Sequence, residues 1–168
     1  MLLADERNVS LKYEDSAEIT KATTATVGER EYLIAPPKAN ALLTEIGIMG
    51  QNGKIKNDMV RKYNQIDHFV SLASDYLKRI EGGAEVLDCA CGKSYLSFAA
   101  YHYFANVRKM KVSMSGVDLK PDVVEHCNKT AKTLGFDGLE FVCGDINDPS
   151  FRAPMLWISL QQPKNRGS

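Results

Sequence analysis

The feature that most constrains the fold is an alternation of strand-like and helix-like segments that begins near residue 84. Four short apolar segments have the length and composition of strands: residues 84–90, 111–119, 138–143 and 153–160. Helical patterns fill residues 93–107 and 121–134, and the second has Pro121 in its first turn and Gly135 just past its end. Strands that alternate with helices of this length form a parallel sheet covered by helices. The sequence therefore predicts an α/β fold.

The segments before residue 84 predict a small extension and one long helix. Apolar side chains recur with a period of 3.6 over residues 57–80, and Asn57 or Asp58 can cap the start of this helix. Upstream, residues 38–47 form a short helical pattern with Gly47 as its expected C-cap, and Asn52-Gly53 indicates a tight hairpin turn. Residues 1–30 predict only a hairpin or an arm. We therefore divide the chain into an extension at 1–56 and a main domain at 57–168.

Composition and charge exclude several classes of protein. Twenty-one basic and twenty-one acidic residues cancel, so the chain lacks the overall positive charge of a general nucleic-acid binder. The first ten residues do not have the layout of a signal peptide, and no apolar run is long enough to span a bilayer. Four cysteines without a secretory signal indicate free thiols in a reducing compartment. We expect a cytoplasmic protein that is not bound to a membrane.

The stretch DCACGKS at residues 88–94 allows three interpretations. A phosphate-binding loop needs a glycine five residues before Gly92, and that position is Leu87. A zinc site built on Cys89 and Cys91 is disfavoured because structural zinc ligands usually have two to four residues between them, whereas this pair has one. These cysteines are therefore expected in the core, and no metal is expected. The third interpretation is a nucleotide site at the end of the first strand, where small residues let a ligand approach the backbone.

The spacing of three acidic residues favours the third interpretation. Asp88, Asp118 and Asp145 each follow one of three successive strands. The carboxyl ends of parallel strands meet at one edge, so these carboxylates are expected to line a common crevice. Asp118 can accept hydrogen bonds from both ribose hydroxyls, and Asp145 can accept one from an adenine amino group.

These residues resemble the class I S-adenosylmethionine-dependent methyltransferases. Residues 88–92 are similar to the family's first motif, with Ala90 where glycine is commoner, and LDCACGKSYLSFAAYHYF with the upstream LLTEIGIMGQNGKIKNDMVRKYNQIDHF resembles a methyltransferase-like subfamily of the ribosomal RNA adenine dimethylase domain-containing type. The resemblance implies a Rossmann-like sheet with helices on both faces and S-adenosyl-L-methionine as cofactor. It implies these cofactor-binding residues: Asp88, Cys89, Ala90, Gly92, Ser94, Asp118, Leu119, Asp145 and Ile146.

The resemblance covers about residues 30–150 and ends before the part of the fold that binds the methyl acceptor. Class I enzymes have seven strands, whereas this sequence supplies four in the order third, second, first, fourth. We therefore expect the amino-terminal half of a methyltransferase, truncated after its fourth strand, that binds cofactor without appreciable turnover. The exposed edge of the fourth strand predicts pairing with a second copy as a homodimer. No catalytic residue is assigned.

Several alternatives stay open at this point. The acceptor is RNA or protein, with RNA favoured by the resemblance. Lys62 and Gln65 lie on the polar side of the long helix, which is either a solvated face or a cap over the cofactor's carboxylate. A nicotinamide-dinucleotide oxidoreductase would require more glycines and an acid nearer to them. A non-catalytic interaction module would keep the fold with a closed pocket.

Overall fold

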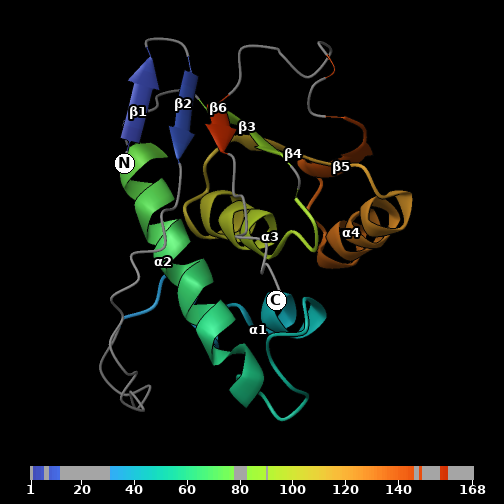
Figure 1. Cartoon of the computed structure of the whole chain (residues 1–168). Coiled ribbons are helices and arrows are strands. Elements are labelled where there is room, and N and C mark those ends of the chain that lie inside the picture. Colours follow the sequence, from blue (N-terminus) through green and yellow to red (C-terminus); the bar gives the residue numbers. More distant parts are fainter. Residues whose placement is uncertain are drawn as a thin grey trace, which may run out of the picture.

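The fold is built on a four-stranded sheet, seen here in a computed structural model (Figure 1). The structure describes residues 2–5, 8–11, 31–77, 83–89, 91–145, 148 and 156–158. All strand pairs in the sheet are parallel, and the order is β5-β4-β3-β6. The bounds are β3 (Ala84–Cys89), β4 (Val112–Asp118), β5 (Leu139–Cys143) and β6 (Leu156–Ile158). The predicted parallel sheet and its strand order are confirmed.

The register of the sheet sets how near each strand end lies to the carboxyl edge of the sheet, called the rim below. Asp88 faces Gly116 across the β3–β4 ladder, and Asp118 faces Cys143 across the β4–β5 ladder. Asp118 therefore stands two residues nearer the rim than Asp88 along neighbouring strands.

Three helices pack against the sheet, at nearly the expected positions. They are α2 (Val60–Leu77), α3 (Tyr95–Tyr101) and α4 (Pro121–Leu134). Pro121 opens α4, and Gly135 ends it in the left-handed conformation at φ 66°, as predicted. The prediction that Asn57 or Asp58 caps the long helix was wrong. A 3-10 turn (Asn57–Met59) precedes α2, and the N-cap of this turn is Lys56, which makes no side-chain capping hydrogen bond. The reason is that Asn57 and Asp58 already lie inside this turn. A π-helical turn (His102–Val107) extends α3.

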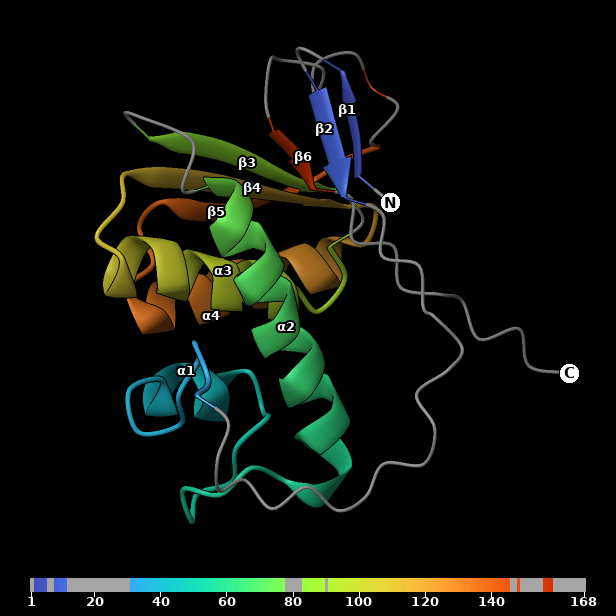
Figure 2. The ribbon, with the colours of Figure 1, turned by 90° about the vertical axis from the view of Figure 1, so that its left-hand side faces the viewer.

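The described helices all lie on one side of the sheet (Figure 2). The crossovers β3-α3-β4 and β4-α4-β5 move in the same direction across the sheet. Because such crossovers are right-handed, both helices fall on the same face. The described part of the chain thus supplies one of the two helix layers that the sequence predicts. A second layer requires crossovers that run in the opposite direction.

The segment before α2 packs into the same apolar core as the helices. It contains α1 (Asn40–Glu45), a short helix that ends before Gly47, whose φ is +77°. Leu43 and Ile48 are fully buried in the cluster that also holds Phe98 and Phe141. The predicted hairpin turn is confirmed by a backbone bridge from Met49 to Ile55. The division of the chain at residue 57 stays a prediction.

Near the amino terminus, β1 (Leu2–Asp5) and β2 (Asn8–Leu11) form an antiparallel pair, and β2 lies beside β6 (Figures 1 and 2). None of the helices in the described ranges has both the length and the apolarity needed to cross a membrane.

Candidate functional site

The carboxylate of Asp118 joins two loops at the rim of the sheet. Its Oδ2 accepts a hydrogen bond from the backbone N–H of Gly92 at 2.9 Å, and its Oδ1 accepts one from the N–H of Lys120 at 3.0 Å. Its own carbonyl accepts a bond from the N–H of Gly144. Asp118 therefore holds the loop after β3 against the end of β4 and contacts the start of the loop after β5. Each carboxylate oxygen keeps a second lone pair, because these two hydrogen bonds use one lone pair per oxygen.

The loop at residues 91–94 is a tight turn that needs a left-handed backbone. Gly92 has a φ of +52°, and a Cβ added there would meet no atom of the described residues within 4 Å. Ser94 also has a positive φ, 52°, and its hydroxyl donates to the carbonyls of Cys91 and Gly92 at 3.4 and 3.3 Å. The Sγ of Cys127 on α4 lies 3.5 Å from the Gly92 oxygen. The space above Gly92 is thus open, as a ligand that approaches the backbone requires.

Asp88 lies in a different environment from Asp118. Only 4% of Asp88 is exposed, and its Oδ2 accepts a hydrogen bond from the hydroxyl of Ser97 on α3. Its Oδ1 is buried and has no hydrogen-bond partner among the described residues. Burial raises the pKa of Asp88 to about 7, the Ser97 bond opposes this rise, and the charge of Asp118 adds to it.

The structure locates most of the other expected site residues. Cys89 is buried with Leu87 and Val117 in a separate small cluster. Leu119 is 70% exposed directly after Asp118, and Asp145 is exposed after β5. Ala90 and Ile146 lie outside the described residues. Asp118, Gly92 and Ser94 are brought together, while Asp88 lies below them under α3.

The thiols beside the loop are held in the protonated form by their surroundings. Burial raises the pKa of Cys91 to about 12 and also raises the pKa of Cys127. Across the described ranges, no group of three or more histidine, cysteine, aspartate or glutamate side chains is arranged to hold a metal ion.

Lys62 of α2 reaches the start of α3. Its Nζ donates to Oε1 of Gln65 at 3.1 Å and lies 5.7 Å from the ring centroid of Tyr95, a cation–π contact. Burial lowers the pKa of Lys62. Lys62 therefore contacts Tyr95, the residue that directly follows the loop carrying Gly92 and Ser94.

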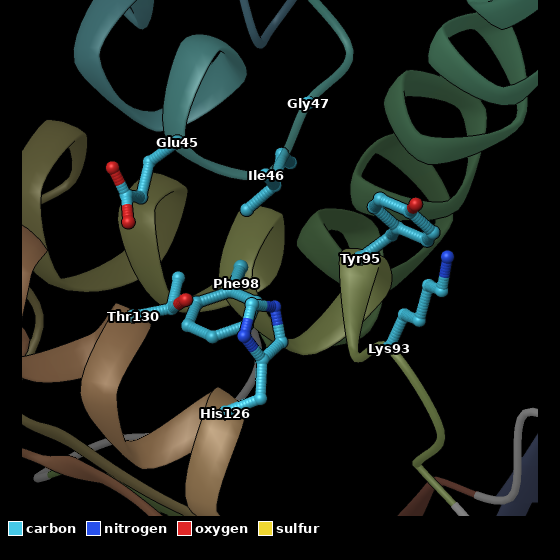
Figure 3. Close-up of a pocket in the computed structure, with 8 residues that line it drawn as sticks. All are labelled: Glu45, Ile46, Gly47, Lys93, Tyr95, Phe98, His126 and Thr130. Atoms are coloured by element: carbon cyan, nitrogen blue, oxygen red, sulfur yellow. The ribbon is translucent and has the colours of Figure 1, made fainter. Parts of the chain in front are cut away.

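A pocket of about 240 Å³ opens beside the same loop (Figure 3). The end of α1 forms one wall, and α3 with α4 forms the other. Its lining residues are Glu45, Ile46, Gly47, Lys93, Tyr95, Phe98, His126 and Thr130. Lys93 connects the pocket to the rim because it directly follows Gly92.

Sequence reasoning missed two positions that shape the site. Ser97 was treated only as part of a helix, although a small polar residue inside an apolar stripe is a signal of an internal hydrogen bond. Gly116 was treated as an ordinary strand residue, yet a Cβ there would lie 2.4 Å from the ring of Phe141 and 3.2 Å from Sγ of Cys91. Gly116 therefore gives Cys91 and Phe141 room at the floor of the loop.

The family follows from a comparison of the whole sequence with protein-family models. The model of a methyltransferase domain matches residues 61–163, which include the α2, α3 and α4 helices and the β3–β6 sheet. This chain belongs to that methyltransferase domain family. The comparison with curated proteins gives no match.

One solved structure confirms the Rossmann-like fold of this methyltransferase domain, and two others are similar to parts of it. A mutant of MtNAS has a TM-score of 0.50 at 16% identity, over 75% of this chain and 46% of that one. Protein-L-isoaspartate O-methyltransferase has a TM-score of 0.43 at 18% identity, over 56% and 28%. A geranyl diphosphate methyltransferase in complex with GPP and sinefungin has a TM-score of 0.38 at 22% identity, over 49% and 27%. The methyltransferase domain thus spans less than half the length of each of these proteins.

Proposed function

We propose that this chain binds S-adenosyl-L-methionine at the carboxyl edge of β3, β4 and β5 and serves methyl transfer. One observation carries the proposal. The Asp118 carboxylate accepts a hydrogen bond from the Gly92 amide at the rim of a sheet that belongs to a methyltransferase domain family. An acid at the end of this strand stands where ribose hydroxyls are bound in related nucleotide-binding sheets.

The residues at the rim fit such a cofactor. The open space above Gly92 admits a ligand to the backbone, and Asp118 keeps acceptor capacity for two hydroxyls. Leu119 offers an exposed apolar side chain next to that carboxylate, a suitable surface for an adenine ring. We assign Asp145 and Ile146 to the adenine end and Asp88, Cys89, Ala90 and Ser94 to the methionine end.

When bound, the cofactor supplies a methyl group on a positively charged sulfur, which a nucleophilic N, O or S atom of an acceptor takes. The chain's part is to bind and orient. Asp118 fixes the ribose, and the tight turn at residues 91–94 sets the position of the methionine end. Lys62 lies near that end, and its ammonium can pair with the cofactor's carboxylate.

The finer assignments rest on sequence resemblance. We propose membership of the ribosomal RNA adenine dimethylase domain-containing subfamily, with RNA as acceptor and protein as the alternative. The four cysteines are free thiols, which supports a reducing compartment such as the cytoplasm. Pairing of two copies through the sheet edge stays a prediction.

Isothermal titration of the full chain with S-adenosylhomocysteine and, separately, with NAD tests the cofactor. We expect saturable binding of S-adenosylhomocysteine and much weaker binding of NAD. Tighter binding of NAD would replace the methyltransfer proposal with a dinucleotide-dependent one. No heat with either ligand, in a sample that circular dichroism shows to be folded, would refute the site and favour a non-catalytic module.

A further inference from the structure

The pocket between α1 and the α3–α4 layer has a buried floor and a charged mouth. Ile46, Phe98 and Thr130 are buried, whereas Glu45, Lys93 and His126 are exposed (Figure 3). This division resembles a ligand site, in which apolar surface supplies contact area and a few polar groups give orientation.

Basic side chains outnumber the single acidic one at the mouth of the pocket. Lys93 comes from the loop after β3 and His126 from α4. The Nζ of Lys56 is 4.0 Å from the position of a Cβ built on Gly47, a residue that lines the pocket. Glu45 is the one carboxylate among the residues that line the pocket. Basic side chains around a concavity raise the local concentration of anions.

The arrangement suits a phosphate group better than a carboxylate. Lys93 and His126 approach from two separate elements, and Thr130, one turn after His126 on α4, adds a hydroxyl to the lining. A phosphate has more acceptor oxygens, arranged tetrahedrally, whereas a carboxylate has two oxygens in a plane. The volume of about 240 Å³ lies below the usual range for a drug-sized ligand, so the pocket suits one phosphate with a small attached group.

Tyr95 adds an aromatic wall beside the basic side chains at the mouth of the pocket. Its ring lines the pocket, and the ammonium of Lys62 contacts that ring. Aromatic rings beside cationic side chains hold nucleotides by stacking and charge together. Across the pocket in Figure 3, Glu45 can accept a hydrogen bond from a ligand hydroxyl or amino group.

We propose that this pocket is a second ligand site that binds the phosphate group of a nucleotide through Lys93 and His126. The phosphate belongs either to a free nucleotide or to a nucleic-acid chain. The pocket adjoins the cofactor edge, because Lys93 and Tyr95 follow Gly92 in the chain, but the phosphate site does not depend on the methyltransfer proposal.

Proton NMR of the histidine rings tests the site directly, because the chain has three histidines. His68 and His102 do not line the pocket and serve as internal controls. The full chain is titrated at constant pH with inorganic phosphate, with adenosine 5′-monophosphate and with a short single-stranded RNA. His126→Gln assigns the resonance, and sodium chloride at matched ionic strength controls for screening.

We expect phosphate to shift the His126 signals saturably and to leave those of His68 and His102 nearly unchanged. Lys93→Ala should weaken phosphate binding at least about tenfold, because it removes a charge-assisted hydrogen bond. Lys132→Ala removes an equal charge from an exposed position outside the pocket and should change little. Glu45→Gln should strengthen the binding of inorganic phosphate, since it removes the one carboxylate of the lining.

The remaining outcomes identify the source of the phosphate or overturn the site. Tighter, salt-sensitive binding of the RNA than of the monophosphate assigns a nucleic-acid backbone. Equal or weaker binding of the RNA assigns a free nucleotide. The proposal is wrong if sodium chloride shifts His126 as phosphate does, or if Lys93→Ala and Lys132→Ala bind phosphate alike.

Discussion

The ends of β3 and β4 carry the same residue in contrasting environments. Asp88 is buried under α3 with one oxygen bonded to Ser97, whereas Asp118 is partly exposed and accepts two backbone N–H groups. Both side chains belong to the helix-covered face, since each follows the alternation of its strand. The difference comes from depth, because Asp88 lies opposite Gly116 and thus two residues behind Asp118. The distance of a strand-end acid from the rim therefore decides whether it is buried under α3, as Asp88 is, or joins the loops there, as Asp118 does.

The largest effect that this comparison predicts is on stability as a function of pH. The pKa of Asp88 is raised in the folded protein from 3.8 to about 7 by burial. Between these values the folded state holds a proton that the unfolded state has lost, so stability falls as pH rises through this window. A shift of this size corresponds to a loss of about 4 kcal/mol. Asp88→Asn should remove this loss and be more stable than the parent at pH 8 relative to pH 5.

Urea unfolding of both proteins at pH 5 and pH 8 measures the effect. Asp122→Asn, an exposed acid in the first turn of α4, is the matched control and should leave the pH dependence as in the parent. Equal pH dependence of the parent and Asp88→Asn would show that this carboxyl titrates normally.

The second effect concerns cofactor binding at the rim. Asp118→Ala removes the proposed ribose acceptor and leaves the Gly92 amide without its partner. We expect the affinity for S-adenosylhomocysteine to fall about a hundredfold or more, since hydrogen bonds to charged groups contribute about 1.5–3 kcal/mol each. Titration calorimetry measures the change, with Asp122→Ala as the control for a lost negative charge. An unchanged affinity would place the ribose elsewhere.

The sequence predicted the secondary structure because the spacing of apolar residues and the residues that begin or end a helix are local properties. The helices between β3 and β4 and between β4 and β5, and the stop at Gly135, follow from patterns within about 15 residues, whereas the strand order was expected from the family resemblance. The start of α2 was misplaced because Asn57 and Asp58 can cap a helix or join its first turn, and the chain that packs before them decides which.

The site was less predictable than the fold for a related reason. Three acids at three strand ends were expected to share one edge, yet the register that buries Asp88 depends on how β3 aligns with β4. Its partner Ser97 and the clearance at Gly116 depend on contacts between distant segments. Such contacts leave only weak local signals in a single sequence.

A smaller effect should sharpen the account of Asp88. Ser97→Ala deletes the hydroxyl that donates to Asp88 and that holds its pKa down. We expect a stability loss of about 1–3 kcal/mol at pH 8, where the carboxyl is charged and left unpaired. At pH 5 the loss should be smaller because the carboxyl is protonated. Urea unfolding at the two pH values tests this, and a loss independent of pH would indicate a packing role for Ser97 alone.

The smallest effect is expected at Leu119, and it separates binding from folding. This side chain is 70% exposed beside Asp118, so Leu119→Ser should change the free energy of unfolding by no more than about 0.5 kcal/mol. If the adenine ring rests on Leu119, the same change exposes apolar ligand surface and should weaken S-adenosylhomocysteine several-fold. Leu72→Ser on α2 is the control, because it is also an exposed apolar residue and lies away from the rim. Calorimetry that gives the same affinity for both variants would remove Leu119 from the adenine end. A selective loss for Leu119→Ser would show that the sheet edge at Asp118 contacts the ligand through an apolar side chain as well as through the carboxylate.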